Sequence, residues 1–410
     1  MARSHTLLGF RTLESMAHRD FRLLWLSATF NSTGDYFKSV VVGWLIYDVT
    51  GSPLLTAFTL GLETFPNLVV NPIGGVLADR MDRRKLMAAS AAYHALFTLG
   101  LATLLLLGRA SAWHVTVYVL LVGMGVAMGQ PARTSYASYV VPPRSLLNAY
   151  ALMSLAYNIA KLTGPGIAGL MLAAYGAGRT MLVPVGLMLT SIAIIAGLRP
   201  IRPEGSGETR SMLREILEAA AAMKRHPVVV ALFLNQVVVY AVMVPAVYGM
   251  LPIYAADVLE IGPAGLGVLN SSLGAGAIGG VLIMASLGSA VHRGWATLVI
   301  MTMGAAAMVA FSQTGSMPAA IAMLVLFNGS LVAMTAIKSS GIQNLTPENL
   351  RGRVAALTTM SNGTSWIGGL VFGALAQWQD ASLATLVGAG VVLASVAVLY
   401  VGYPQLRTYR

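Results

Sequence analysis

The chain has 410 residues, of which 56% are hydrophobic and 10% charged, and its mean hydropathy is +0.73. This composition is too apolar for a soluble protein of this length and predicts a protein of the lipid bilayer. The net charge of +11 would suit a nucleic-acid binder if the basic residues formed one cluster, but they are spread among short loops, so we expect no nucleic-acid partner. The absence of cysteine excludes disulfides, thiolate metal sites and cysteine nucleophiles.

Twelve apolar stretches follow one another along the chain, each close to the ~20 residues that cross ~30 Å of hydrocarbon. We predict membrane-spanning helices at residues 21–47, 54–77, 86–107, 113–137, 146–172, 180–198, 228–255, 265–290, 294–313, 317–342, 353–377 and 381–402. The predicted fold class is therefore an all-α membrane protein with 12 transmembrane helices. Residues 1–20 lack the apolar core of a removable signal peptide, so we expect the first span to direct insertion.

Basic residues alternate between the two sides of the predicted membrane protein. The N-terminal segment, the even-numbered loops and the C-terminus are rich in arginine and lysine, whereas the opposite loops hold only Arg109 and Arg179. Because basic loops are retained in the cytoplasm, we expect both termini to be cytoplasmic and the chain to be a multi-pass protein of the plasma (inner) membrane. Membrane lipids are accordingly expected partners.

The longest polar stretch covers residues 199–226 and contains Pro200, Pro203 and Gly205. We interpret it as a cytoplasmic linker between an N-terminal six-helix bundle at residues 1–198 and a C-terminal six-helix bundle at residues 227–410. A weak repeat supports this division, because the GGVL of residues 74–77 recurs at 279–282. A Pro, Leu, Gly, Gly pattern at 143, 146, 164 and 169 likewise recurs at 347, 350, 368 and 373.

Ionisable residues inside a predicted span are costly in lipid and indicate a cavity or a partner. The first span carries Asn31, Asp35 and Lys38 on one helical face. Two interpretations stay open. Either Asp35 and Lys38 neutralise each other in a structural pair, or Asp35 takes part in proton or substrate binding within a cavity.

The second span carries Glu63, Asn67 and Asn71 at intervals of four residues, with Pro66 expected to bend the helix between them. This polar stripe is disfavoured against lipid, so we expect it to face the protein interior. Glu63 is the second candidate for proton coupling. The alternative is a static, hydrogen-bonded packing role.

Polar residues of the later spans extend the candidate substrate cavity. Span five presents Ser154, Asn158 and Lys161 on one face, and Lys338 lies in span ten. The C-terminal half offers mainly uncharged polarity, which equally suits helix packing. The candidate cavity residues are Asn31, Lys38, Asn67, Asn158, Lys161, Asn235, Tyr240, Asn270, Asn362 and Trp366.

Several kinds of site are not indicated. The six histidines, at positions 5, 18, 94, 114, 226 and 292, lack metal-ligand spacing, and we expect each to be a surface residue and none to bind metal. No glycine-lysine phosphate loop occurs, which argues against ATP as the energy source. We expect no cofactor and no enzymatic activity.

The loop after the second span carries a recognisable motif. Residues 75–85 read GVLADRMDRRK and resemble the G-x-L-A-D-R-x-G-R-[KR] signature of the major facilitator superfamily, departing from it at Asp82. The resemblance implies two pseudo-symmetric six-helix bundles and a conformational latch, here Gly75, Asp79, Arg80, Arg83 and Arg84. Physically, Asp79 can accept hydrogen bonds from amides at the start of a neighbouring helix, while the arginines bind carboxylates or lipid phosphates. Arg351 and Arg353 are expected neighbours of this loop.

Other motifs are similar to those of the drug:proton antiporter branch, which includes macrolide and siderophore exporters. Gly34-Asp35 and the YDVTGS of residues 47–52 match patterns of that branch. Residues 160–169, AKLTGPGIAG, resemble its antiporter motif, in which Gly164, Pro165 and Gly169 would let helices approach closely and flex.

The resemblance implies a monomeric secondary transporter that exports an amphipathic small molecule, drug-like or siderophore-like. It would work by proton antiport and alternating access, with Asp35 and Glu63 exchanging protons and the proton gradient as energy source. Because lysines occur inside the predicted spans, a substrate with an anionic or zwitterionic group is a further alternative. A lipid or lysolipid flippase of the same fold is the alternative, and a non-transporting membrane sensor is a third.

Overall fold

The computed structural model describes residues 11–201, 218, 220–221, 223–224, 226–287, 292–346 and 351–408. Every regular element within these residues is helical. The N-terminal helices are α1 (Arg19–Thr50), α2 (Pro53–Leu62), α3 (Pro66–Arg80), α4 (Arg83–Leu106), α5 (Ala112–Val140), α6 (Leu146–Thr180) and α7 (Leu182–Ala196). The C-terminal helices are α9 (Pro227–Val238), α10 (Val244–Tyr248), α11 (Leu251–Ile253), α12 (Gly262–Leu287), α13 (Arg293–Ser312), α14 (Met317–Leu345), α15 (Arg351–Ser361), α16 (Ser365–Trp378), α17 (Ala381–Gly402) and α18 (Pro404–Thr408).

Each of the predicted spans falls on one of these helices or on consecutive helices, which confirms the helix positions. Within the described ranges, eight helical segments are long and apolar enough to cross a membrane, and α6 and α7, bent by 72°, can add one more. The charged α1 and the broken pair α15 and α16 are not among the eight. The count of twelve crossings therefore stays a prediction.

The turn between α1 and α2 shows how local sequence ends one helix and starts the next. Gly51 adopts a φ of 58°, which is accessible to glycine at little cost, and its amide donates to the Tyr47 carbonyl at the end of α1. Ser52 then caps α2, because its Oγ accepts from the Leu55 amide at 3.2 Å, and Pro53 occupies the first turn. Residues 51–53 thus reverse the chain within three positions.

Two of the predicted spans, besides the one formed by α15 and α16, are interrupted. Pro66 begins α3 after a short break behind Leu62, at the position where the sequence predicts a bend. In the seventh predicted span, π-helical stretches at Val239–Met243 and Tyr254–Val258 flank α10 and α11. Such breaks free backbone groups and reorient side chains inside a helix bundle.

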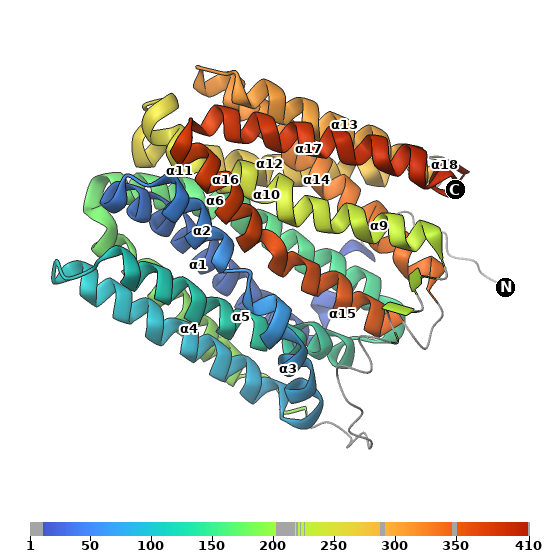
Figure 1. Cartoon of the computed structure of the whole chain (residues 1–410). Coiled ribbons are helices and arrows are strands. Elements are labelled where there is room, and N and C mark those ends of the chain that lie inside the picture. The colour runs from blue at the N-terminus through green and yellow to red at the C-terminus, as the bar shows by residue number, and fades with distance from the viewer. Residues whose placement is uncertain are drawn as a thin grey trace.

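The N-terminal and C-terminal helices meet along two pairs, α6 with α12 and α2 with α16 (Figure 1). Glycine permits the close approach, since a Cβ on Gly169 would lie 2.8 Å from the Gly267 Cα, and one on Gly61 would lie 2.8 Å from the Trp366 Cα. Near the α1–α2 turn, Tyr47 donates to Asp257, and Ser52 Oγ donates to Gln377 Oε1 at 2.7 Å. These contacts close that end of the interface.

Much of the outer surface is apolar. Leu96, Leu170 and Val401 expose 65%, 63% and 74% of their surface. A soluble protein seldom exposes large apolar patches, whereas a helix bundle in lipid must. The predicted linker at 199–226 falls largely outside the described residues, so the domain boundaries stay a prediction. Pro347 and Leu350 of the repeat also lie outside them.

Candidate functional site

A cavity of about 390 Å³ lies between the N-terminal and the C-terminal helices. Side chains of α1, α2, α5 and α6 form one side of it, and side chains of α10 and α12 form much of the other. The structure brings five residues that were singled out in the sequence into this one cavity: Asp35, Glu63, Lys161, Pro165 and Asn270. A charged cavity shared by the two groups of helices is the central feature of the site.

Asp35 reaches the cavity from the middle of α1. Its neighbour Gly34 lies against α7, where an added Cβ would be 3.6 Å from the Pro184 carbonyl, so α1 approaches α7 closely beside Asp35. Asn31, one turn earlier, donates from Nδ2 to Asp35 Oδ2 at 3.1 Å. The predicted polar face of α1 therefore positions the carboxylate.

His94 is the second neighbour of Asp35, and the sequence expectation for it was wrong. It was expected at the surface, but it is only 2% exposed, and its Nδ1 lies 3.5 Å from Asp35 Oδ1. The other ring nitrogen, Nε2, is buried and has no hydrogen-bond partner among the described residues. Histidine next to a carboxylate is a common device for holding or passing a proton.

Lys38 pairs with Glu63 rather than with Asp35, so the structural pair that was one of the two interpretations of Asp35 does not form. The Nζ and Oε1 atoms are 2.6 Å apart, with the Lys38 side chain 1% exposed and that of Glu63 30% exposed. Glu63 directly follows α2, at the start of the short break before α3, and from there its side chain reaches Lys38 of α1. The lysine charge is thus neutralised within the helix pair.

Lys161 of α6 has neutral partners from the C-terminal helices. Its Nζ donates to the Tyr248 hydroxyl at 2.8 Å and lies 3.4 Å from Asn328 Oδ1. Tyr248 in turn donates to the same Asn328 oxygen at 2.7 Å. Within the described part of the chain, no ion pair involves Lys161. The cavity therefore contains a cation that no carboxylate neutralises.

A separate pocket of about 220 Å³ lies within the C-terminal helices. It contains Tyr240 and Asn362, so these two candidates do not share the pocket of Asp35. Lys338 donates to Gln236, and Gln236 Nε2 donates to Asn362 Oδ1 at 3.0 Å. This chain of hydrogen bonds joins α14, α9 and the turn before α16.

The remaining cavity candidates have other neighbours. Asn67 donates to the Thr64 carbonyl at 3.1 Å, within the break after α2. Asn158 lies 3.5 Å from Ser154 Oγ on its own helix, and Asn235 is fully buried with Nδ2 at 2.5 Å from Met301 Sδ. Trp366 packs edge-on against Phe65 with ring centroids 5.9 Å apart. None of these four is among the residues that line the central cavity.

The motif at residues 75–85 differs from expectation in one respect. Asp79 was expected to accept from helix-start amides, but its Oδ1 lies 3.9 Å from the Arg83 guanidinium, and Asp82 Oδ1 instead accepts from the Arg84 amide at 2.9 Å. Arg84 also donates to the Leu198 carbonyl at 3.1 Å, and Arg80 is exposed. Asp82 therefore caps α4, as its place directly before the helix favours.

The neighbours of this motif are partly described. A Cβ on Gly75 would meet nothing within 4 Å. Arg351 and Arg353, the expected partners, have side chains outside the described residues.

The glycine-proline motif of α6 lies where this helix contacts α1 and α12. Gly164 faces α1, with an added Cβ 3.4 Å from the Thr33 carbonyl, and Gly169 faces α12, with an added Cβ 2.6 Å from the Pro263 carbonyl. Pro165 lies between them and lines the cavity. The motif thus lets α6 pack between α1 of the N-terminal helices and α12 of the C-terminal helices.

Two site residues were not singled out from the sequence, Tyr248 and His94. Both are polar groups in the interior of an otherwise apolar predicted span, and that signal could have marked them. Their partners could not be inferred, because Tyr248 meets Lys161 and His94 meets Asp35 only across different helices.

A family model described as transmembrane secretion effector matches residues 11–408. Among curated proteins, the multidrug efflux pump Tap of Mycolicibacterium fortuitum is 26% identical over 396 residues, covering 94% of this chain and 96% of that protein. The enterobactin exporter EntS of Escherichia coli O1:K1 is 26% identical over 417 residues, covering 100% of this chain and 97% of that protein.

Solved structures share the fold. A POT family transporter in complex with 5-aminolevulinic acid superposes with a TM-score of 0.78 at 10% identity, covering 95% of this chain and 97% of that chain. A bacterial homologue of the human lysosomal transporter Spinster, in an inward-facing and unoccupied conformation, gives a TM-score of 0.67 at 16% identity, covering 94% and 95%. These likenesses confirm the all-helical membrane fold class predicted from the sequence.

Proposed function

Because this chain belongs to the transmembrane secretion effector family of the major facilitator superfamily, we propose that it exports an amphipathic small molecule by secondary active transport. The membership confirms the resemblance seen in the motif at residues 75–85. The observation that carries the proposal is the charged cavity between the two groups of helices. A site formed by both halves of a transporter changes its access when the halves rock.

Alternating access is supported by the contacts around this cavity. On the side of the α1–α2 turn, the Tyr47–Asp257 and Ser52–Gln377 hydrogen bonds join the two groups of helices. If these few polar contacts broke, the cavity could open on the side of the α1–α2 turn. The glycines at the α6–α12 contact would let these two helices move past each other. The substrate would bind in one arrangement and leave in the other.

Proton antiport is the proposed energy source, with Asp35 as the first proton site. Asp35 has a neutral amide and a histidine as partners, so it can gain or lose a proton without breaking an ion pair with lysine or arginine. Glu63 is the second site, and its protonation would release Lys38. A change of charge at either carboxylate alters which helix contacts are favourable, which couples proton binding to conformation.

The substrate class follows from Lys161. A cation that faces the cavity and is held by Tyr248 and Asn328 favours a substrate with an anionic or zwitterionic group. The apolar cavity wall, with Leu60, Val126 and Leu266, favours a hydrophobic part in the same molecule. Siderophore-like molecules and acidic drugs combine the two, as do lysolipids, which is why a flippase is the alternative function.

Transport by purified protein in proteoliposomes tests the proposal. Efflux of a candidate substrate should respond to an imposed pH gradient, and the Asp35→Asn and Glu63→Gln variants should lose that response. Asp48→Asn, an exposed carboxylate near the end of the same helix α1, is the matched control and should behave like the wild type. Coupling that survives both cavity substitutions contradicts the assignment of the proton sites, and transport of lysolipid that ignores the pH gradient would favour the flippase.

We also propose that the chain is a monomer of the plasma (inner) membrane with both termini in the cytoplasm. The loop charges support this orientation. Because the chain has no cysteine, the labelling of single introduced cysteines measures this orientation directly. A cysteine at Ser52 should react with an impermeant maleimide added outside cells, and one at Ser138, near the other end of the bundle, should not.

A further inference from the structure

A large hollow lies away from the central cavity, on the outer side of the C-terminal helices. It has a volume of about 1080 Å³ and is formed by α12, α13 and α14, with Arg407 of α18 at its rim. Its walls are almost wholly apolar and include Ile283, Ile300, Met303 and Leu326. The volume exceeds the ~300–1,000 Å³ of ordinary small-molecule pockets.

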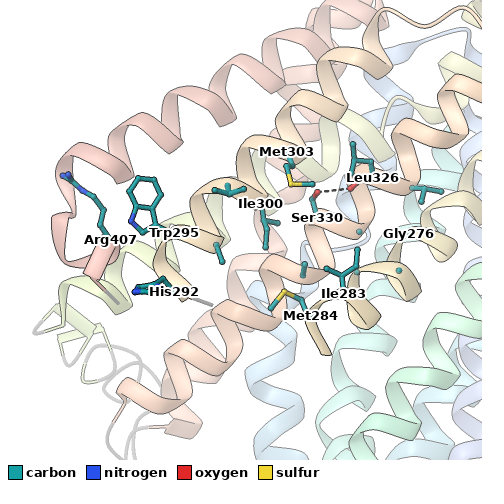
Figure 2. Close-up of a pocket in the computed structure, with 17 residues that line it drawn as sticks. Gly276, Ile283, Met284, His292, Trp295, Ile300, Met303, Leu326, Ser330 and Arg407 are labelled. Atoms are coloured by element: carbon teal, nitrogen blue, oxygen red, sulfur yellow. Dashed lines mark hydrogen bonds between the residues drawn. The ribbon is translucent and has the colours of Figure 1, made fainter. Parts of the chain in front are cut away.

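One end of this groove is polar and cationic. Figure 2 shows Arg407, Trp295 and His292 together at that end, with Leu326 and Gly276 toward the other. The Arg407 guanidinium lies over the Tyr400 ring at 4.2 Å from its centroid. Within the described part of the chain, its buried Nε has no hydrogen-bond partner and Arg407 forms no ion pair. An anion at this end would supply a partner that the described residues do not.

The aromatic residues at the cationic end of the groove indicate how deep this end lies in a bilayer. Trp295 is 46% exposed and packs against Tyr400, with ring centroids 5.8 Å apart. Tryptophan, tyrosine and arginine gather at the boundary between headgroups and acyl chains. From Trp295 to Met303 the groove follows about 12 Å of α13, close to the ~15 Å of hydrocarbon in one leaflet. The groove therefore runs from headgroup level towards the bilayer centre.

Small residues create the groove. A Cβ on Gly279 would meet nothing within 4 Å, so the missing side chain leaves open space along α12. Gly276 and Gly280 bring α12 against α14, where an added Cβ would lie 2.3 Å from the Val325 carbonyl and 2.4 Å from the Gly329 carbonyl, respectively. The helices thus form a continuous floor, and Gly279 leaves room above it.

A second apolar groove, of about 610 Å³ between α4 and α5, provides a contrast. It is lined by residues such as Leu96, Leu104 and Trp113, and none of its lining residues is arginine or lysine. Its one histidine, His114, already contacts Ser111 Oγ at 2.7 Å. A lipid tail could lie in either groove, but only the α12–α14 groove has an arginine for a headgroup phosphate.

We propose that the groove between α12, α13 and α14 is a binding site for one anionic phospholipid, with an acyl chain along Gly279 and the headgroup phosphate on Arg407. The apolar walls match the acyl chain, and the unneutralised guanidinium matches the phosphate in charge and geometry. The site is independent of the proposed transport cavity, because the two share no lining residue.

Native mass spectrometry of the full chain in detergent, titrated with phosphatidylglycerol or phosphatidylcholine, tests this site. The wild type should retain one phosphatidylglycerol in preference to phosphatidylcholine. Arg407→Gln should weaken phosphatidylglycerol retention about fivefold. Gly279→Leu should weaken retention of both lipids, because the new side chain fills the groove. Gly390→Leu, at an exposed α17 glycine with equally open surroundings, and Arg109→Gln are the matched controls.

Three outcomes decide the question. Unchanged retention in both Arg407→Gln and Gly279→Leu overturns the proposal. Displacement of the lipid by millimolar inorganic phosphate would show that the site binds free phosphate and also overturns it. A photoactivatable phosphatidylglycerol provides a readout without variants: crosslinks within residues 295–303 support the proposal, and crosslinks spread evenly over the spanning helices contradict it.

Discussion

Asp35 and His94 face each other between α1 and α4, with Oδ1 and Nδ1 3.5 Å apart, and no lysine or arginine of the described chain forms an ion pair with Asp35. This arrangement differs from that of Glu63, which is held by Lys38 at 2.6 Å. The cavity thus contains one carboxylate that is free to exchange a proton and one that is committed to a charged partner.

His94 should therefore affect coupling more than binding. We expect His94→Gln to reduce pH-driven transport about tenfold, because the buried ring is the group that can share a proton with Asp35. Substrate affinity, measured by the concentration dependence of a thermal shift, should change little. His114→Gln is the matched control, since His114 lies near the start of α5 beside Ser111. Equal losses in the two variants would contradict a special role for His94.

The Lys38–Glu63 pair should couple energetically. Glu63→Gln leaves Lys38 buried without a counter-charge and should lower the free energy of unfolding by about 2–3 kcal/mol, less than a fully buried pair because Glu63 is 30% exposed. Removing the charge as well, in Lys38→Met with Glu63→Gln, should recover part of that loss. Denaturation by SDS of the two single variants and the double variant measures the coupling. Strictly additive losses would show that the pair is not coupled.

The contact between Ser52 and Gln377 should control one end of the cavity. Because Oγ and Oε1 are 2.7 Å apart and the chain lacks cysteine, a Ser52→Cys, Gln377→Cys variant should be joined by a short bifunctional thiol reagent. The crosslink should hold the α2–α16 end closed and stop transport, and a reversible reagent should allow recovery after reduction. Each single-cysteine variant controls for modification alone. Full transport by the crosslinked protein would exclude movement at this end.

Gly169 should not tolerate a side chain. A Cβ there would lie 2.6 Å from the Pro263 carbonyl, so Gly169→Val should force α6 from α12 and cost about 1–3 kcal/mol. Gly186→Val, on α7 with nothing within 4 Å of an added Cβ, is the control and should unfold at nearly the wild-type temperature. If both variants melt alike, the close α6–α12 contact does not stabilise the protein.

The helices themselves follow from the sequence. Apolar windows predicted each spanning helix, and the structure has helices at those positions because a chain in lipid must satisfy its backbone hydrogen bonds internally. Local chemistry also predicted an irregularity at Pro66, in the form of a bend, because proline cannot donate within a helix, and the structure has a break in the helix directly before it. The shared face of Asn31 and Asp35 followed in the same way from helical periodicity.

The partners of the charged residues were decided only by tertiary structure. Periodicity shows which residues of one helix share a face, but not which neighbouring helix lies opposite. A pair of Lys38 with Asp35 was therefore one of two open interpretations, whereas the structure pairs Lys38 with Glu63. His94 was expected at the surface, whereas α4 packs it against Asp35. Lys161 meets Tyr248 for the same reason, because α6 lies against the C-terminal helices. Side chains that are 87 residues apart become neighbours only when helices pack.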